Sequence, residues 1–215
     1  MSQTLINQED GGALTTQGLT AIKNNFADIY AQVQSNNQLG ATAVDNLPGS
    51  GFVNKQLSAA GMNPGATGAD NVLAVFSLPA NALAAAGNGV IVTAYGQFGA
   101  TGNNKRVKII FNPATAVVGS TVGAGGTTIA DTGTVATNAG GFSIEGSVFK
   151  YGAFGSNTQI GLNDFNLVAG ANEALVVPAA ITATENAAIL IAVTGNATTV
   201  VGDISLNAMI VEATN

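Results

Sequence analysis

The sequence contains no cysteine, no histidine and no tryptophan, and only 8% of its residues are charged. Without histidine or cysteine, the chain can build neither a Ser-His-Asp triad nor a Cys-His pair. It also lacks the ligands of the usual zinc sites. No disulfide can form, so we expect stability to come from burial or from oligomerisation. These absences favour a protein that is not an enzyme and that uses no cofactor and no metal.

Carboxylates leave one enzymatic alternative, because glycoside hydrolysis needs only two of them. The twelve Asp and Glu residues are scattered, and the only cluster is the Glu9-Asp10 pair. No dense acidic loop of the calcium-binding kind is present. We expect Glu145 and Asp203 to lie on solvated strand faces. A Ser-Lys dyad would need one of the six basic residues beside a serine, and no motif marks such a pair.

Charge and hydropathy also exclude two classes of partner. The net charge is −6, whereas nucleic-acid binding requires a basic surface. The longest apolar runs, such as Ala187 to Val193, are far shorter than the roughly 20 residues of a transmembrane helix. The first ten residues lack the basic start and apolar segment of a secretory signal. We therefore expect no nucleic acid and no membrane among the partners.

Small and β-branched residues dominate what is present. Glycine accounts for 28 of 215 residues, against an average near ~7%. The mean hydropathy is +0.34, and 47% of the residues are hydrophobic. Such a composition suits pleated sheets joined by tight turns and is poorly suited to long helices. The sequence predicts a mainly β protein.

Residues 1–36 are predicted to be an N-terminal arm with an amphipathic helix. Its apolar residues follow the alternating spacing of three and four that is typical of a left-handed coiled coil; they are Leu19, Ile22, Phe26, Ile29 and Val33, and Tyr30 widens the stripe. Two heptads are fewer than a firm coiled coil requires. The stripe is therefore interpreted either as a self-associating oligomer contact, as a capsid contact, or as one helix packed on its own domain.

Residues 37–70 are predicted to be an extended linker. Breakers recur at close intervals, as in Leu47-Pro48-Gly49-Ser50-Gly51 and Gly61-Met62-Asn63-Pro64-Gly65. A stretch of this length without its own core is uncommon unless it lies on a partner or is disordered.

Residues 71–215 are predicted to form a jelly-roll-like antiparallel β-sandwich. Apolar and polar residues alternate at Val90 to Phe98, Arg106 to Phe111, Phe142 to Lys150 and Asp203 to Ile210, as in half-buried strands. Ala187 to Val193 is apolar on both faces and is predicted to be a central strand. Weaker strand candidates are Ala116 to Val122, Thr127 to Ala136, Gln159 to Val168 and Ala174 to Val177.

The one basic cluster is Lys105, Arg106 and Lys108, which holds three of the six positive charges. The alternation places Arg106 and Lys108 on one strand face. The cluster is interpreted as a solvated face or an intersubunit salt-bridge patch, or else as a contact with an acidic partner or a glycan. The glycine-rich segments Gly123–Gly126 and Gly140-Gly141 lie between expected strands and are interpreted as turns.

Three segments follow one another along the chain: Leu78–Ala84, Gly87–Phe98 and Asn103–Lys108. In this order they resemble a widespread phage jelly-roll module, which has a "sIPAN-L" segment, a "G-itawGtF" strand and an "NN-K-vki-F" strand. Gly141–Gln159 is similar to the middle strand pair of that module. The resemblance covers about residues 70 to 213. In addition, Ala21–Ala31 resembles the opening helix of many phage fibre and virion proteins.

This resemblance implies a phage virion structural protein. In that family the module commonly forms trimers, and it occurs in capsid decoration proteins, head fibres and tail fibres. No long shaft precedes the sandwich, so a long fibre is not expected. We expect a capsid decoration (cement) protein on the capsid surface, made in the host cytoplasm, with the major capsid protein and its own copies in a homotrimer as partners. A short fibre, spike or head fibre that binds a host glycan is the alternative.

Overall fold

The computed structural model describes residues 53–62, 68–136, 140–168, 171–172, 175–197 and 202–214, with the backbone alone at 53–62 and 171–172. The chain divides into two units, Met1–Asn46 and Leu47–Asn215, and all described residues belong to the second. Every regular element in these ranges is a strand, so no helix there could span a membrane. The predicted N-terminal helix and its apolar stripe lie outside the described residues.

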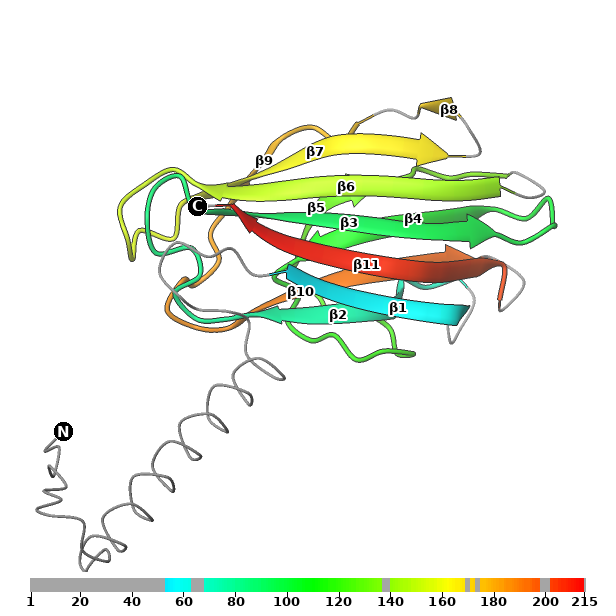
Figure 1. The fold of residues 1–215 in the computed structure, drawn as a ribbon, viewed down its shortest axis with the longest axis horizontal. Helices are drawn as coiled ribbons and strands as arrows, with labels where there is room; N and C mark the ends of the chain where they lie inside the picture. The colour runs from blue at the N-terminus through cyan, green and yellow to red at the C-terminus, as the bar shows by residue number, and fades with distance from the viewer. Residues whose placement is uncertain are drawn as a thin grey trace, which may run out of the picture. The chain divides into compact units, whose positions relative to one another are not determined.

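The described strands form two antiparallel sheets (Figure 1). The larger sheet has the order β1 (Val53–Met62), β11 (Ile204–Thr214), β3 (Gly89–Phe98), β6 (Gly140–Lys150), β7 (Gln159–Val168) and β8 (Ala171–Asn172), and β9 (Ala179–Ile181) also pairs with β7. The smaller sheet has the order β2 (Asn71–Leu78), β10 (Ile189–Ala197), β4 (Lys105–Phe111) and β5 (Thr127–Asp131).

The two sheets pack against each other in a sandwich-like arrangement. Ile129 of β5 lies directly against two glycines of the larger sheet. A Cβ added at Gly146 would approach the Ile129 carbonyl oxygen to 2.8 Å, and one at Gly161 would approach Ile129 Cγ2 to 2.8 Å. These glycines therefore allow β5 to approach β6 and β7 closely.

Strand alternation builds the core between the sheets, because every second side chain of a strand faces inward. The alternation predicted for three strands is confirmed, because the apolar side chains that it places on one face are buried: Val90, Val92, Ala94 and Phe98 on β3, Val107, Ile109 and Phe111 on β4, and Phe142, Ile144 and Val148 on β6. The ring centroids of Phe98 and Phe142 lie 5.1 Å apart. The predicted central strand is also confirmed, since β10 lies between β2 and β4.

The final strand departs from the predicted alternation. Sequence spacing places Ala208 and Ile210 inward after Leu206, but the structure buries Met209 and Val211 instead. The pairing register of β11 with β3 shifts between Leu206 and Ala208. A β-bulge inserts one extra residue, which moves all later side chains to the opposite face.

Strand β1 lies within the range 37–70, for which breaker residues predicted a linker. It pairs with β11, with Val53 opposite Glu212 and Leu57 opposite Ala208. Val53–Met62 is therefore an edge strand of the larger sheet and not linker, although the breaker-rich segment Gly61 to Gly65 begins inside it. Conversely, the strand expected at Ala116 to Val122 is a loop with a single bridge at Thr121, and described residues 175–177 form no strand.

Candidate interaction surfaces

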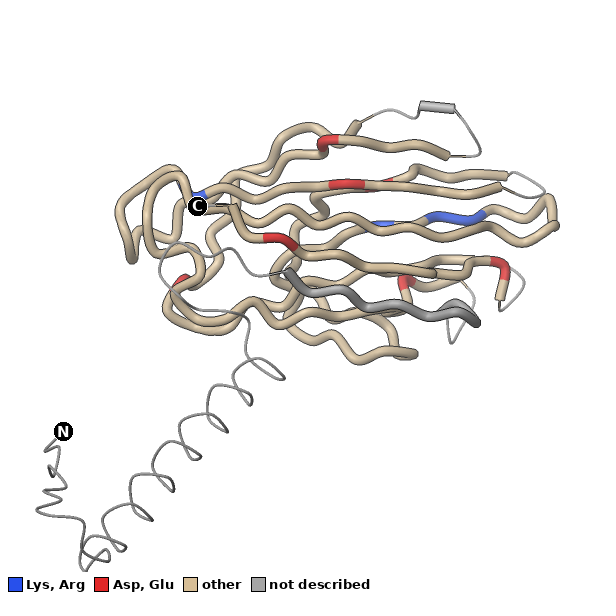
Figure 2. The backbone as a smooth tube through the Cα atoms, in the orientation of Figure 1, with Lys and Arg blue, Asp and Glu red and all other residues tan. Residues whose placement is uncertain are grey.

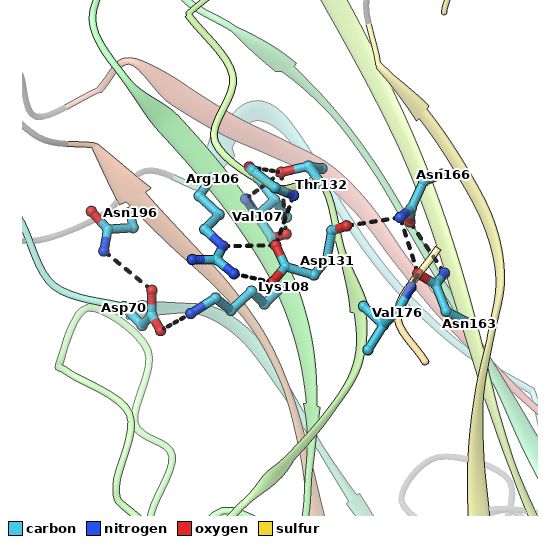
Figure 3. A network of polar contacts seen from close by, with 11 residues as sticks. Asp70, Arg106, Val107, Lys108, Asp131, Thr132, Asn163, Asn166, Val176 and Asn196 are labelled. Atoms are coloured by element: carbon cyan, nitrogen blue, oxygen red, sulfur yellow. Dashed lines mark hydrogen bonds and ion pairs between the residues drawn. The ribbon is translucent and has the colours of Figure 1, made fainter. Parts of the chain in front are cut away.

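The cations of β4 that face outward are paired within the chain (Figure 3). Arg106 Nε donates to Asp131 Oδ1 at 2.8 Å, and Arg106 Nη2 donates to Asp131 Oδ2. The hydrogen bond to Asp131 raises the pKa of the Arg106 guanidinium. Lys108 Nζ lies 2.6 Å from Asp70 Oδ2, and Asn196 Nδ2 lies 3.2 Å from Asp70 Oδ1. The positive charge of both side chains is therefore neutralised before any partner arrives.

Asp131 also connects the smaller sheet to the larger one (Figure 3). Its backbone oxygen accepts a hydrogen bond of 2.7 Å from Asn166 Nδ2 on β7. Asn166 and Asn163 exchange side-chain hydrogen bonds of 3.0 and 3.2 Å. Asn163 Oδ1 accepts a further bond from the Val176 amide at 2.9 Å. These hydrogen bonds join β5, β7 and the segment before β9, so their polar groups stabilise the fold.

Lys105, the third member of the predicted charge patch, is buried. Its ammonium donates to two backbone carbonyls, those of Thr101 and of Asn103, the latter at 3.1 Å. Asp203, expected on a solvated face, is also buried and accepts from Thr101 Oγ1 at 2.7 Å and from Asn103 Nδ2 at 3.2 Å. Both groups hold the loop between β3 and β4, so neither is presented at the surface.

A third ion pair is buried inside the protein. Lys150, the last residue of β6, and Glu185 form an ion pair whose side chains are both 0% exposed. Gln159 Nε2 donates to Glu185 Oε1 at 2.7 Å, and the Gly155 amide donates to Oε2 at 2.9 Å. Burial raises the pKa of Glu185, but the hydrogen bonds from Lys150, Gly155 and Gln159 outweigh it and lower the pKa below its usual value.

The same lysine contacts a serine. Lys150 Nζ lies 2.7 Å from Ser156 Oγ and 3.1 Å from Thr158 Oγ1. A lysine that activates a serine must be neutral to accept its proton. Here Lys150 Nζ instead donates to the Glu185 carboxylate as well as to the two hydroxyl oxygens. The contact therefore anchors the loop 151–158 and is not arranged as a nucleophile with its base.

Eight large apolar side chains are exposed among the described residues. Tyr95 on β3 is 43% exposed and Phe165 on β7 is 40% exposed, and both belong to the larger sheet. Tyr151 and Phe154 are 60% and 54% exposed in the loop after β6. Other exposed large apolar residues are Val117, Val118, Leu175 and Val177. These positions, more than the charged ones, are open to a partner.

The site residues predicted from sequence fall into two groups. The stripe of the N-terminal arm, comprising Leu19, Ile22, Phe26, Ile29, Tyr30 and Val33, lies outside the described residues. Lys105, Arg106 and Lys108 are adjacent on β4, but each bonds within the chain. Sequence reasoning missed the Lys150–Glu185 pair. The one available signal was the alternation of β6, which places Lys150 on the inward face with Phe142, Ile144 and Val148.

Among the described residues, no three acidic side chains gather closely enough to hold a metal ion. No family model matches the sequence, and no curated protein matches it. Among solved structures, the chain is similar to a protein of unknown function from Shewanella oneidensis MR-1, with 12% identity, a TM-score of 0.38, and coverage of 95% of this chain and 96% of that one. A similarity at this level carries no argument about function.

Proposed function

We propose that the chain is a structural protein of a bacteriophage particle, a capsid decoration protein that binds the outside of the head as a homotrimer. The resemblance of the segments Leu78–Ala84, Gly87–Phe98 and Asn103–Lys108 to a phage module motivates this proposal. These segments correspond to the connection from β2 to β3, to β3 with its preceding turn, and to the start of β4. They are structural parts of the sheets, as the module's motifs are.

We further propose that the sandwich-like fold is a jelly roll. Strands β2, β3 and β4 alternate between the smaller and the larger sheet. The late strands then return beside the early ones, with β10 between β2 and β4, and β11 beside β3. A chain that winds over two sheets and returns between its first strands has the connectivity expected of a jelly roll built from Greek keys.

The observation that carries the proposal is that the described basic side chains are paired with acidic ones or buried within the chain. Arg106, Lys108 and Lys150 are each paired with an acid, and Lys105 is buried. The exposed surface of the described residues is instead rich in small polar and apolar side chains. Such a surface is suited to broad contact with a protein lattice, because little charge must be desolvated on binding.

A protein of this kind needs no chemistry to act. Binding to the assembled lattice, and not to the separate capsid subunits, would stabilise that lattice by linkage. In a homotrimer, three individually weak contacts add through effective concentration. The major capsid protein is the proposed partner, and the capsid surface is the proposed location.

The test compares particles assembled with and without this protein. We expect particles without it to lose integrity at lower temperature or after a milder osmotic shock, while their adsorption to the host stays unchanged. Particles of unchanged stability that adsorb poorly would overturn the decoration proposal and support the alternative of a short fibre, spike or head fibre. The exposed aromatic residues Tyr151 and Phe154 are the observation that keeps this alternative in view, because such side chains are common in recognition surfaces.

A further inference from the structure

The outer face of the larger sheet has an ordered arrangement of side chains around β6. Val90, Val92 and Ala94 of β3 face the core, so Ile91, Thr93 and Tyr95 face outward. On β6 the corresponding outward residues are Ser143, Glu145 and Ser147. The pairing register places Tyr95 opposite Ser143, Thr93 opposite Glu145, and Ile91 opposite Ser147.

Strand β7 borders β6 on its other side. Leu167 lies opposite Ser143, Phe165 opposite Glu145, and Leu162 opposite Ser147. These three outward side chains of β6 are thus short or polar, and the next outward one along the strand is Phe149. Most of the outward side chains on both neighbouring strands are large and apolar. This arrangement gives a polar row along β6 between two apolar rows that include Tyr95 and Phe165.

The polar row has bonding capacity that the described residues do not use. Thr93 Oγ1 donates to Glu145 Oε2 at 2.8 Å, which holds the carboxylate in place, and no described donor bonds Oε1. Ser147 Oγ is buried and has no hydrogen-bond partner among the described residues. A buried hydroxyl without a partner is uncommon in native proteins. Ser147 itself is only 1% exposed, so the half-buried Glu145 carboxylate is the group of this row that a ligand from outside can reach.

The charge of this face restricts the ligand. Its described ionisable side chains are acidic only, namely Glu145, Asp164 and Glu212, whereas the described basic residues lie on β4 and at the buried end of β6 (Figure 2). An acidic surface repels phosphates, nucleic acids and acidic sugars. A ligand for this row should therefore carry no negative charge.

The spacing of the two exposed aromatic rings further narrows the choice. Tyr95 and Phe165 lie two strands apart and one outward position apart along the strands. With strands about 4.8 Å apart and a rise of about 3.4 Å per residue, their backbones are separated by roughly 12 Å. This separation suits a chain of a few sugar rings, whose apolar faces stack on aromatic rings while their hydroxyls bond carboxylate and hydroxyl groups.

We propose that the outer face of the larger sheet binds a neutral oligosaccharide along β6, with Tyr95 and Phe165 as stacking platforms and Glu145 as the principal acceptor for sugar hydroxyls. The inference goes beyond capsid binding and does not depend on it. A second copy of the chain on this face is the competing occupant, and the experiment below separates the two.

The test titrates the full chain with three neutral probes, maltohexaose, cellohexaose and chitohexaose, by calorimetry, with a hyaluronan hexasaccharide as the anionic comparison. We expect at least one neutral probe to bind and the anionic one not to bind. Tyr95→Ala and Phe165→Ala should each weaken that binding at least tenfold, and Glu145→Gln severalfold. Val118→Ala, which removes an exposed apolar side chain from the loop between β4 and β5, is the control and should leave binding unchanged.

Two results would overturn the inference. One is the absence of binding by all three neutral probes at millimolar concentration. The other is binding that survives Tyr95→Ala and Phe165→Ala but is lost in Tyr151→Ala. Light scattering on the same variants tests whether a second copy of the chain occupies this face. If the wild-type chain binds no probe and is oligomeric, and the Phe165→Ala variant is monomeric, then this face joins copies of the chain. Particle stability, measured separately, decides the decoration proposal whichever result is found.

Discussion

The ammonium of Lys150 and the carboxylate of Glu185 form an ion pair from which solvent is excluded on all sides. The two residues are 35 positions apart in the sequence. Their pair joins the end of β6 to the turn before β10, and through Gly155, Ser156 and Thr158 it also holds the loop that carries Tyr151 and Phe154. The exposed aromatic loop therefore depends on a buried contact for its conformation.

Removing one member of this pair should be strongly destabilising. Glu185→Gln leaves the Lys150 charge buried without a counter-ion, and we expect a loss of about 3–5 kcal/mol in the free energy of unfolding. The double variant Lys150→Met, Glu185→Gln removes that charge and should recover part of the loss. Urea unfolding followed by circular dichroism measures both. A Glu185→Gln protein within about 1 kcal/mol of the wild type would contradict the assigned role.

The same pair predicts a specific acid sensitivity. Because the folded-state pKa of Glu185 lies below its ordinary value of 4.5, its stabilising contribution is complete above about pH 4.5 and is lost as the pH falls through the folded-state pKa. Thermal unfolding between pH 7 and pH 2 should therefore show a steeper decline of Tm below pH 4.5 in the wild type than in Glu185→Gln. Parallel curves for the two proteins would count against this linkage.

Close approach of the two sheets at Gly146 gives a third prediction. A methyl group there would lie 2.8 Å from the backbone oxygen of Ile129, which cannot move without shifting β5. We expect Gly146→Ala to lower the free energy of unfolding by about 1–3 kcal/mol. Gly141→Ala on the same strand is the control, since its nearest contact would be an ordinary 3.6 Å. Equal stability of the two variants would exclude tight packing at Gly146.

The paired cations of β4 predict a small effect on both stability and binding. The Arg106 side chain is 41% exposed, and partly exposed ion pairs contribute at most about 1 kcal/mol. Arg106→Gln should therefore unfold within about that margin of the wild type and bind phage heads normally in co-sedimentation. A variant that unfolds normally but no longer sediments with heads would instead identify Arg106 as a partner contact.

Deleting residues 1–36 tests the arm that was predicted from the apolar stripe at Leu19, Ile22, Phe26, Ile29 and Val33. If this stripe grips the capsid or joins copies, the truncated chain should keep its β-sheet circular dichroism and lose binding to heads. Light scattering then tells whether trimers are lost as well. A truncated protein that still decorates heads would show that the sandwich alone makes the contact.

The strand pattern of this fold was largely readable from the sequence, because alternation of apolar and polar residues reports which side chains face a core. Val90, Val107 and Phe142 with their alternating neighbours are buried as that pattern predicts. The pattern failed where local geometry breaks the period of two. At β11 a single extra residue turns Met209 and Val211 toward the core in place of Ala208 and Ile210. No residue type in that strand indicates a bulge.

The polar contacts were less predictable, since each joins residues that are distant in sequence. Lys150 stands at an inward position, which signals a buried partner, but nothing in the sequence selects Glu185 over the other acids. Asp203 alternates as an outward residue, yet the loop at Thr101 and Asn103 folds over it. Strand β1 was missed for a related reason: an edge strand is recognised by its pairing with β11, and its flanking glycines and prolines read as a linker.

The central claim, that this chain decorates the phage head, is tested most directly by imaging assembled particles at subunit resolution by electron cryo-microscopy. The account predicts density for the two-sheet domain on the outer surface of the head, in contact with the major capsid protein and grouped in threes. Density for this domain confined to the tail or to fibre tips, with a bare head surface, would contradict it.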